Sequence, residues 1–259
     1  FEFRAVGSLA NCAGAMTVLN SIVAKQLKEF KVAVDKLIKD KKMKKDDAVF
    51  NVLREYIKKS KKIRFEGDGY GEAWEKEAEK RGLSNNRTTP LALKAQVSKK
   101  TIALYKELGV MNETEIEARH EIELEEYAMR IQIEGRILGD IARNHIIPTS
   151  IRYQNILIKN VRGLKDIYAD DFARHAKEQL EIIESISSHI ASINSNVNAM
   201  IEARKIANKL EDAEEKAFAY CDDVKPFFEE IRYHCDKLEL LVDDEIWPLA
   251  KYRELLFTR

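Results

Sequence analysis

Glycine, proline and cysteine are all scarce in this sequence of 259 residues. There are 10 glycines, 4 prolines and 3 cysteines, whereas folds rich in sheets and tight turns depend on glycine and proline. Charged side chains, in contrast, make up 34% of the chain, which is typical of long helices with a solvated face. The composition therefore predicts a mainly α fold.

The few cysteines also argue against an oxidising compartment. Cys12, Cys221 and Cys235 are odd in number and widely spaced, whereas small secreted domains carry closely spaced, paired cysteines. No stretch approaches the roughly 20 apolar residues that a membrane-spanning helix needs. We therefore expect a cytoplasmic protein with no membrane partner.

An excess of charge of one sign is absent as well. The 44 basic residues are balanced by 44 acidic residues, so no overall field attracts nucleic acid. The lysine-rich run KDKKMKKDD, residues 39–47, contains no aromatic residue and ends in two aspartates. It indicates a solvated connection between two helices, with Asp46 or Asp47 capping the second, and no nucleic-acid partner is expected.

Self-contained catalytic motifs are missing from the helical part of the sequence. The glycine-rich GDGYG, residues 67–71, lacks the lysine and hydroxyl residue of a P-loop and indicates a turn. The five histidines fall mostly on separate segments, and the cysteines lack the C-x-x-C spacing of a zinc site. This part therefore predicts neither an active site nor a metal centre of its own.

The strongest helical pattern runs from Glu113 to about Ile158. One apolar row on it consists of Leu124, Ala128, Ile131, Gly135, Leu138 and Ala142, and a second of Met129, Ile133, Ile137 and Ile141. Together the rows make a face too broad for a surface helix, which predicts a central helix. Small residues at every seventh position predict close approach of another helix, and Pro148 predicts a kink or a break near Ile147.

Two further amphipathic segments follow, one reaching about Leu210 and one running from Ala213 to Ile246. The later segment carries a heptad-like apolar series and is joined to the earlier one by a short polar link near Glu211. Long helices joined by a short loop pack antiparallel. The sequence therefore predicts a helical hairpin arm.

The first residues, FEFRAVGS, have a different pattern from the rest. Phe1 and Phe3 alternate with Glu2 and Arg4, so a strand would place the two charged side chains on one face. A glutamate can hold a divalent cation, and an arginine can clamp a carboxylate or a phosphate. Such pairs are also common surface ion pairs, so the residues alone leave both interpretations open.

Several long motifs resemble glutamine synthetases, and specifically the type III family. They are FEFRAVGSLANCAGAMTVLNSIVAKQL, RFEGDGYGEAWEKEAEKRGL, IEARHEIELEEYAMRIQIEGRILGDIARNHIIPTSIRYQN and AYCDDVKPFFEEIRYHCDKLELLVDDEIWPLAKYRELLF. The resemblance covers essentially the whole chain. It implies the C-terminal third or so of a longer ATP-dependent glutamate–ammonia ligase, which uses Mg²⁺ or Mn²⁺ and assembles into stacked rings of identical subunits.

The resemblance also gives the first strand a role. It implies that Glu2 is a metal ligand and that Arg4 contacts either the phosphoryl group in transfer from ATP to glutamate or the acyl phosphate that is formed. NNRTTP, residues 85–90, echoes another motif of the family, but it follows the strand instead of preceding it. Because the other metal-binding glutamates and the nucleotide motifs are missing, we expect this chain alone to be inactive.

These observations divide the sequence into three parts. Residues 1–38 are expected to end the catalytic α/β domain with a strand and a helix, residues 39–111 to form a helical connection with loops, and residues 112–259 to form the long-helix region with its arm. The alternative is a free-standing helical module that binds a partner or oligomerises without catalysis. The lone strand and the missing initiator methionine favour the ligase fragment.

Overall fold

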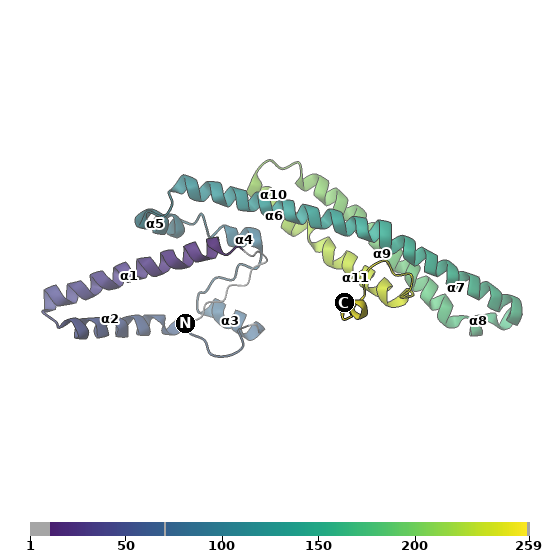
Figure 1. Ribbon diagram of the computed structural model, residues 1–259, viewed down its shortest axis with the longest axis horizontal. Coiled ribbons are helices and arrows are strands. Elements are labelled where there is room, and N and C mark those ends of the chain that lie inside the picture. Colours follow the sequence, from purple (N-terminus) through teal and green to yellow (C-terminus); the bar gives the residue numbers. More distant parts are fainter. Residues whose placement is uncertain (1–10, 70, 258–259) are drawn as a thin grey trace. The chain divides into compact units, whose positions relative to one another are not determined.

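The computed structural model describes residues 11–69 and 71–257 and confirms the mainly α fold (Figure 1). The strand predicted for residues 1–6 lies outside the described residues, and those that are described contain no strand. The chain divides into two compact units, one up to His120 and one from Glu121. We refer to them as the first and the second unit.

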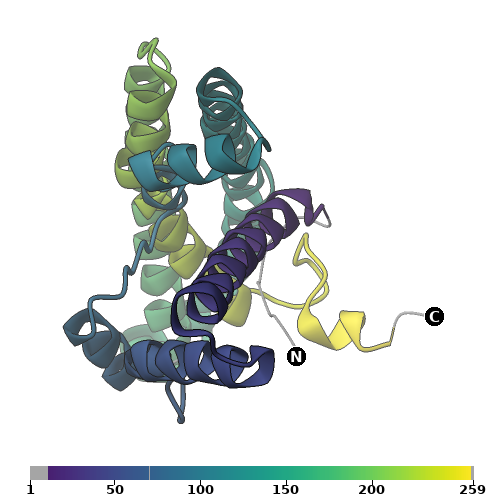
Figure 2. The ribbon, with the colours of Figure 1, turned by 90° about the vertical axis from the view of Figure 1, so that its left-hand side faces the viewer.

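The first unit is built on a hairpin of α1 (Ala13–Lys41) and α2 (Lys45–Ser60), which lie side by side in Figures 1 and 2. Its small core contains Val34, Ala48 and Val52, and the rings of Phe30 and Tyr56 meet edge to face at 5.9 Å. Lys42 adopts a left-handed conformation with φ of 49° and ends α1. The lysine-rich run is thus the predicted connection between helices.

The predicted cap of α2 is wrong. Lys44 occupies the capping position without a side-chain hydrogen bond, and Asp46 and Asp47 lie in the first turn. Acidic side chains in the first turn still stabilise the helix, because they face the positive end of its dipole. Three shorter helices complete the unit, namely α3 (Glu72–Lys80), α4 (Thr89–Leu93) and α5 (Lys99–Leu108).

The second unit is an assembly of long helices. It contains most of α6 (Glu113–Ile141), then α7 (Ile147–Tyr168), α8 (Phe172–His175), α9 (Lys177–Ala207), α10 (Ala213–Ala219), α11 (Pro226–Leu241) and α12 (Tyr252–Leu255). The predicted hairpin arm is present, since α9 and α11 make the most extensive helix–helix contact of the described chain. The turn at residues 208–212 is too short for any arrangement other than antiparallel.

Both prolines within the long helices follow a wider, π-helical turn. Residues Ala142–Ile146 form one ahead of Pro148, and Tyr220–Val224 form the other ahead of Pro226. Proline lacks the N–H that continues an α-helix and crowds the preceding turn, and a π turn accommodates this without breaking the rod. The kink predicted near Ile147 therefore takes the form of a π turn.

The core of the second unit lies between α9, α11 and the rod formed by α6 and α7. Fully buried side chains include Ile186, Ile193, Val197 and Met200 of α9 and Ile231 and Leu238 of α11. Gly135 allows the close approach that was predicted, because a Cβ there would lie 3.2 Å from the ring of Phe228. The small-residue positions of α6 thus face the arm.

The broad apolar face predicted for α6 is buried along only one of its two rows. Leu124, Ala128 and Ile131 of the first row are buried, whereas Met129, Ile133 and Ile137 of the second row are about half exposed. A helix that packs against a single hairpin buries only one stripe of its surface. The second row therefore remains a solvent-facing apolar surface of this chain.

Candidate functional site

The two residues singled out by sequence, Glu2 and Arg4, lie outside the described residues. Only eight residues separate Arg4 from Ala13, where α1 begins. Helix α1 is consequently the described element closest in sequence to the candidate catalytic pair.

The first half of α1 is rich in large apolar side chains, and most of them are exposed. Between Ala13 and Leu27 the only charged residue is Lys25. Met16, Ile22 and Leu27 are 54%, 47% and 63% exposed, and Val18 and Val23 are exposed to a similar degree. Large apolar side chains are more often buried than exposed. In the described structure this half of α1 is therefore a largely exposed apolar surface.

Next to this apolar half, α5 is attached to α1 through an ion pair. The Lys25 ammonium contacts the carboxylates of Glu107, from α5, and Glu29. The hydrogen bond to Glu107 raises the pKa of Lys25 and, in return, lowers the pKa of Glu107. Both side chains are partly exposed, so the pair orients α5 more than it stabilises the unit.

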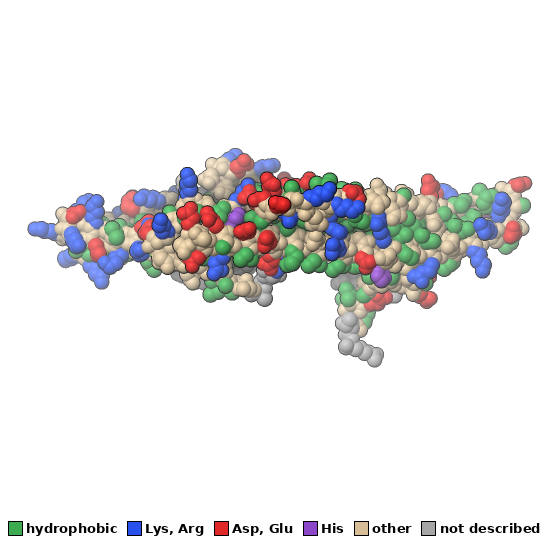
Figure 3. Space-filling model, turned by 90° about the horizontal axis from the view of Figure 1, so that it is seen from above, with side chains coloured by type: hydrophobic (Ala, Val, Ile, Leu, Met, Phe, Trp, Pro, Cys, Tyr) green, Lys and Arg blue, Asp and Glu red, His purple; other side chains and the backbone are tan. Residues whose placement is uncertain are grey.

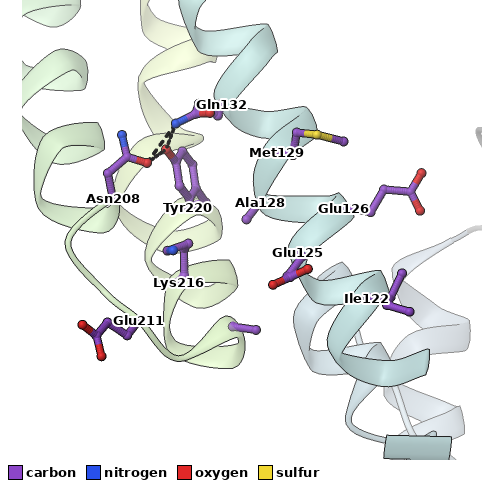
Figure 4. A pocket seen from close by; sticks show the side chains of 11 residues that line it. Ile122, Glu125, Glu126, Ala128, Met129, Gln132, Asn208, Glu211, Lys216 and Tyr220 are labelled. Carbon is purple, nitrogen blue, oxygen red and sulfur yellow. Dashed lines mark hydrogen bonds between the residues drawn. The ribbon is translucent and has the colours of Figure 1, made fainter. Parts of the chain in front are cut away.

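A hollow lies in the second unit, where α6 faces the tip of the hairpin arm. It encloses about 640 Å³ and is lined by residues that include Glu125, Met129, Glu211 and Lys216. At its inner end Tyr220 donates a hydrogen bond of 2.6 Å to the Asn208 Oδ1 atom, and Gln132 donates to both side chains (Figure 4). This network fastens the tip of the arm to α6. Sequence analysis missed it, because its members come from three segments.

Histidines His189 and His234 also meet, although they are 45 positions apart. Their Nδ1 atoms lie 2.9 Å apart across α9 and α11. Burial lowers the pKa of His189, and the nearby His234 and Lys237 lower it further, which favours the neutral form of the His189 ring. Among the described residues no three His, Cys, Asp or Glu side chains come close enough to hold a metal ion.

The described cysteines do not form a reactive site. Cys12 is exposed, and Cys221 and Cys235 are buried free thiols. Burial, with the charge of Asp236, raises the pKa of the Cys235 thiol to about 12, so almost none of it is a nucleophilic thiolate near neutral pH. The second unit thus offers packing, hydrogen bonds and surfaces, and no catalytic constellation among its described residues.

Comparison with known proteins identifies a family and relatives that the chain resembles. Residues 48–165 match the family model described as the glutamine synthetase C-terminal domain. The whole chain aligns with a protein named glutamine synthetase from Bacteroides fragilis (strain YCH46), with 48% identity over 260 residues that cover 36% of that protein. It also aligns over its whole length with a type-3 glutamine synthetase from Dictyostelium discoideum, at 30% identity and 35% coverage of that protein.

The chain belongs to the glutamine synthetase family. It spans about a third of the length of the curated relatives it matches. The domain match runs from α2 into α7 and so includes the whole of α6. The resemblance in the first residues lies outside that domain match and within the alignment to the full-length glutamine synthetases. In the described part of the chain no helix is both long and apolar enough to cross a membrane.

Proposed function

We propose that this chain is the C-terminal part of a type III glutamine synthetase, an ATP-dependent glutamate–ammonia ligase that forms glutamine through a γ-glutamyl phosphate. The observation that carries the proposal is the 48% identity to the Bacteroides fragilis protein over the entire chain. The apolar, exposed first half of α1 supports it, because such a helix requires further protein around it. Residues 1–38 would then end the catalytic domain and residues 112–259 would form the C-terminal long-helix region. Residues 39–111 would connect the two.

In this proposal Glu2 and Arg4 belong to the active site of the complete enzyme. Glu2 is a ligand for Mg²⁺ or Mn²⁺, for which a carboxylate is a suitable donor. Arg4 contacts the phosphoryl group in transfer, where a guanidinium neutralises charge spread over several oxygens. The bound cation would supply further neutralisation of the ATP phosphates. Catalysis of this kind depends mainly on position and charge, so these two residues would make a substantial contribution.

The substrates of the complete enzyme would be glutamate, ammonia and ATP. The enzyme would act in the cytoplasm. We also propose that it assembles from identical subunits in stacked rings. Neither nucleic acid nor a membrane has a place in this function. The balanced charge of the chain, 44 basic against 44 acidic residues, supports the absence of a nucleic-acid partner.

The test is ATP-dependent glutamine formation by the complete protein that contains this chain. We expect activity that requires a divalent cation, and none from the 259-residue chain alone. Arg4→Ala should lower kcat by about 10²-fold, the usual effect of removing one charge-stabilising donor. Glu2→Gln should raise the cation concentration needed for half-maximal rate.

Glu66→Gln is the matched control, because Glu66 lies in an exposed loop of the first unit. Its activity should equal that of the parent protein. A complete protein that forms no glutamine would end the ligase proposal and leave the helical interaction module in its place. An active protein that tolerates Glu2→Gln and Arg4→Ala would remove these two residues from the site.

A further inference from the structure

The hollow between α6 and the tip of the hairpin arm has the size of a small-molecule site. It encloses about 640 Å³, and pockets that bind small molecules usually enclose about 300–1,000 Å³. Ile122, Ala128 and Met129 of α6 and Ala213 of α10 supply its apolar lining. All of its lining residues belong to the second unit, so the hollow lies within one compact part of the chain.

Hydrogen bonds hold the two walls of the hollow together. Tyr220, at its inner end, is 1% exposed and donates to Asn208, and Gln132 of α6 donates to both of these side chains (Figure 4). The network joins α6 to the arm tip without any ligand. A site whose walls are already in place has less conformational entropy to lose when a ligand binds. The hollow is therefore preformed in the described structure.

Four charged side chains line the hollow, and most of this charge is not neutralised. Glu126 forms an ion pair with Arg130. The side chains of Glu125, Glu211 and Lys216 make no ion pair or hydrogen bond with the rest of the described chain. Lys216 remains unpaired although it is partly buried and shares the hollow with three carboxylates. Two carboxylates and one ammonium are thus available to a ligand.

The surroundings of the hollow favour a ligand with a net positive charge. Residues 121–126, the part of α6 that borders it, contain four glutamates and no lysine or arginine. Figure 3 shows acidic side chains over this half of the helix. Charge of one sign around a concave site raises the local concentration of oppositely charged molecules. A purely anionic ligand is therefore disfavoured, even though Lys216 could hold one of its groups.

We propose that the hollow binds an amino acid with a basic side chain, of the class of lysine and arginine. Such a molecule carries two cationic groups and one carboxylate, which complement the two carboxylates and one ammonium of the hollow. Glu125 and Glu211 each face one cationic group, and Lys216 faces the carboxylate. The methylene chain of the ligand packs on the apolar lining. A diamine would leave Lys216 unpaired, and a neutral side chain would leave one glutamate unpaired.

Calorimetric titration of the chain with L-lysine tests the proposal, and its outcome does not depend on the ligase proposal. We expect saturable binding of one molecule per chain. L-Norleucine lacks the side-chain ammonium of lysine, and cadaverine lacks its carboxylate. Each should bind at least tenfold more weakly than L-lysine, the usual effect of losing one charged contact. A chain that binds neither L-lysine nor L-arginine, or that binds L-lysine, L-norleucine and cadaverine equally, would overturn the proposal.

Two substitutions separate the two ends of the ligand. Lys216→Met removes the ammonium and should raise the dissociation constant for L-lysine at least tenfold, whereas the dissociation constant for cadaverine should stay the same or fall. Glu211→Gln should raise the dissociation constants for both compounds at least tenfold. Weaker cadaverine binding in Lys216→Met would show that Lys216 does not face the ligand carboxylate and would overturn the proposal.

Glu184→Gln is the matched control. Glu184 is an exposed glutamate of α9 in the same unit, and it does not line the hollow. The L-lysine affinity of this variant should equal that of the parent chain. Equal weakening by Glu184→Gln and Glu211→Gln would indicate general attraction of cations and would overturn the proposal. Circular dichroism checks that every variant keeps its helices, and Glu125→Gln takes the place of Glu211→Gln if the latter does not fold.

Discussion

Two glycines of α6, four residues apart, should respond in opposite directions to the same substitution. Gly135 and Gly139 are both buried against the hairpin arm. A Cβ on Gly135 would lie 3.2 and 3.3 Å from two ring atoms of Phe228, closer than normal contact. A Cβ on Gly139 would lie 3.4 Å from the Met200 Cε atom and 3.5 Å from Val197, which is an ordinary contact.

The magnitudes follow from two opposing effects. Replacing glycine by alanine within a helix stabilises it by about 0.5–1 kcal/mol. At Gly139 nothing opposes this gain, so Gly139→Ala should raise the free energy of unfolding by about 1 kcal/mol. At Gly135 overpacking costs about 1–3 kcal/mol, so Gly135→Ala should lower the free energy of unfolding by about 1 kcal/mol.

The assay is urea unfolding followed by the fluorescence of Trp247, which is buried in the second unit. The other tryptophan, Trp74, lies in the first unit and is replaced by phenylalanine in every variant, so that the signal reports on the second unit. Phe228→Leu should reduce the destabilisation that Gly135→Ala causes. It should show no coupling with Gly139→Ala in a double-mutant cycle. Stabilisation by both alanines would refute the close approach of α6 and the arm.

Three further outcomes are expected. Tyr220→Phe removes the hydroxyl that bonds Asn208 and Gln132 and should lower the free energy of unfolding by about 1 kcal/mol in the same assay; no change would mean that the network does not hold the arm tip. The pKa of His189 is lowered in the folded chain, so as the pH falls below about 6.5, the usual histidine value, the unfolded chain binds a proton first. The free energy of unfolding should therefore decline from that pH until the pKa of the folded chain is reached. His189→Gln should flatten that decline in urea titrations at several pH values, and an unchanged slope would exclude His189 as its source. Iodoacetamide at pH 8 should modify Cys12 alone in the native chain, as mass spectrometry can show, whereas rapid labelling of Cys235 would contradict its burial.

The fold could be predicted from sequence wherever a local pattern determines the structure. The helical hairpin arm followed from two apolar series and a short link. The chemistry of proline predicted an interruption near Ile147, although not that it would be a π turn. On α6, however, both apolar rows fit the helical period equally well. Only the position of the arm decides that Ala128 is buried and that Met129 is not. Periodicity identifies faces of a helix, whereas packing selects between them.

The candidate site shows a different limit. The roles of Glu2 and Arg4 came from resemblance to a family, because two charged residues on a strand have many uses. The His189–His234 contact depends on the relative register of α9 and α11, to within one turn. Ring nitrogens separated by 45 positions come together only when both helices are placed, and no local pattern predicts that. Similarly, Asn208, Gln132 and Tyr220 become a network only in three dimensions.

The pairing of helices that are neighbours in sequence has a consequence for how the chain folds. Helix α1 packs on α2, α7 on α9, and α9 on α11, so most loops that must close are short. Proteins with such local contacts fold quickly, on the microsecond to millisecond scale. The apolar first half of α1 is the exception, because nothing nearby in the sequence covers it. Until another protein surface covers it, this apolar segment is the part of the described chain most prone to aggregate during synthesis.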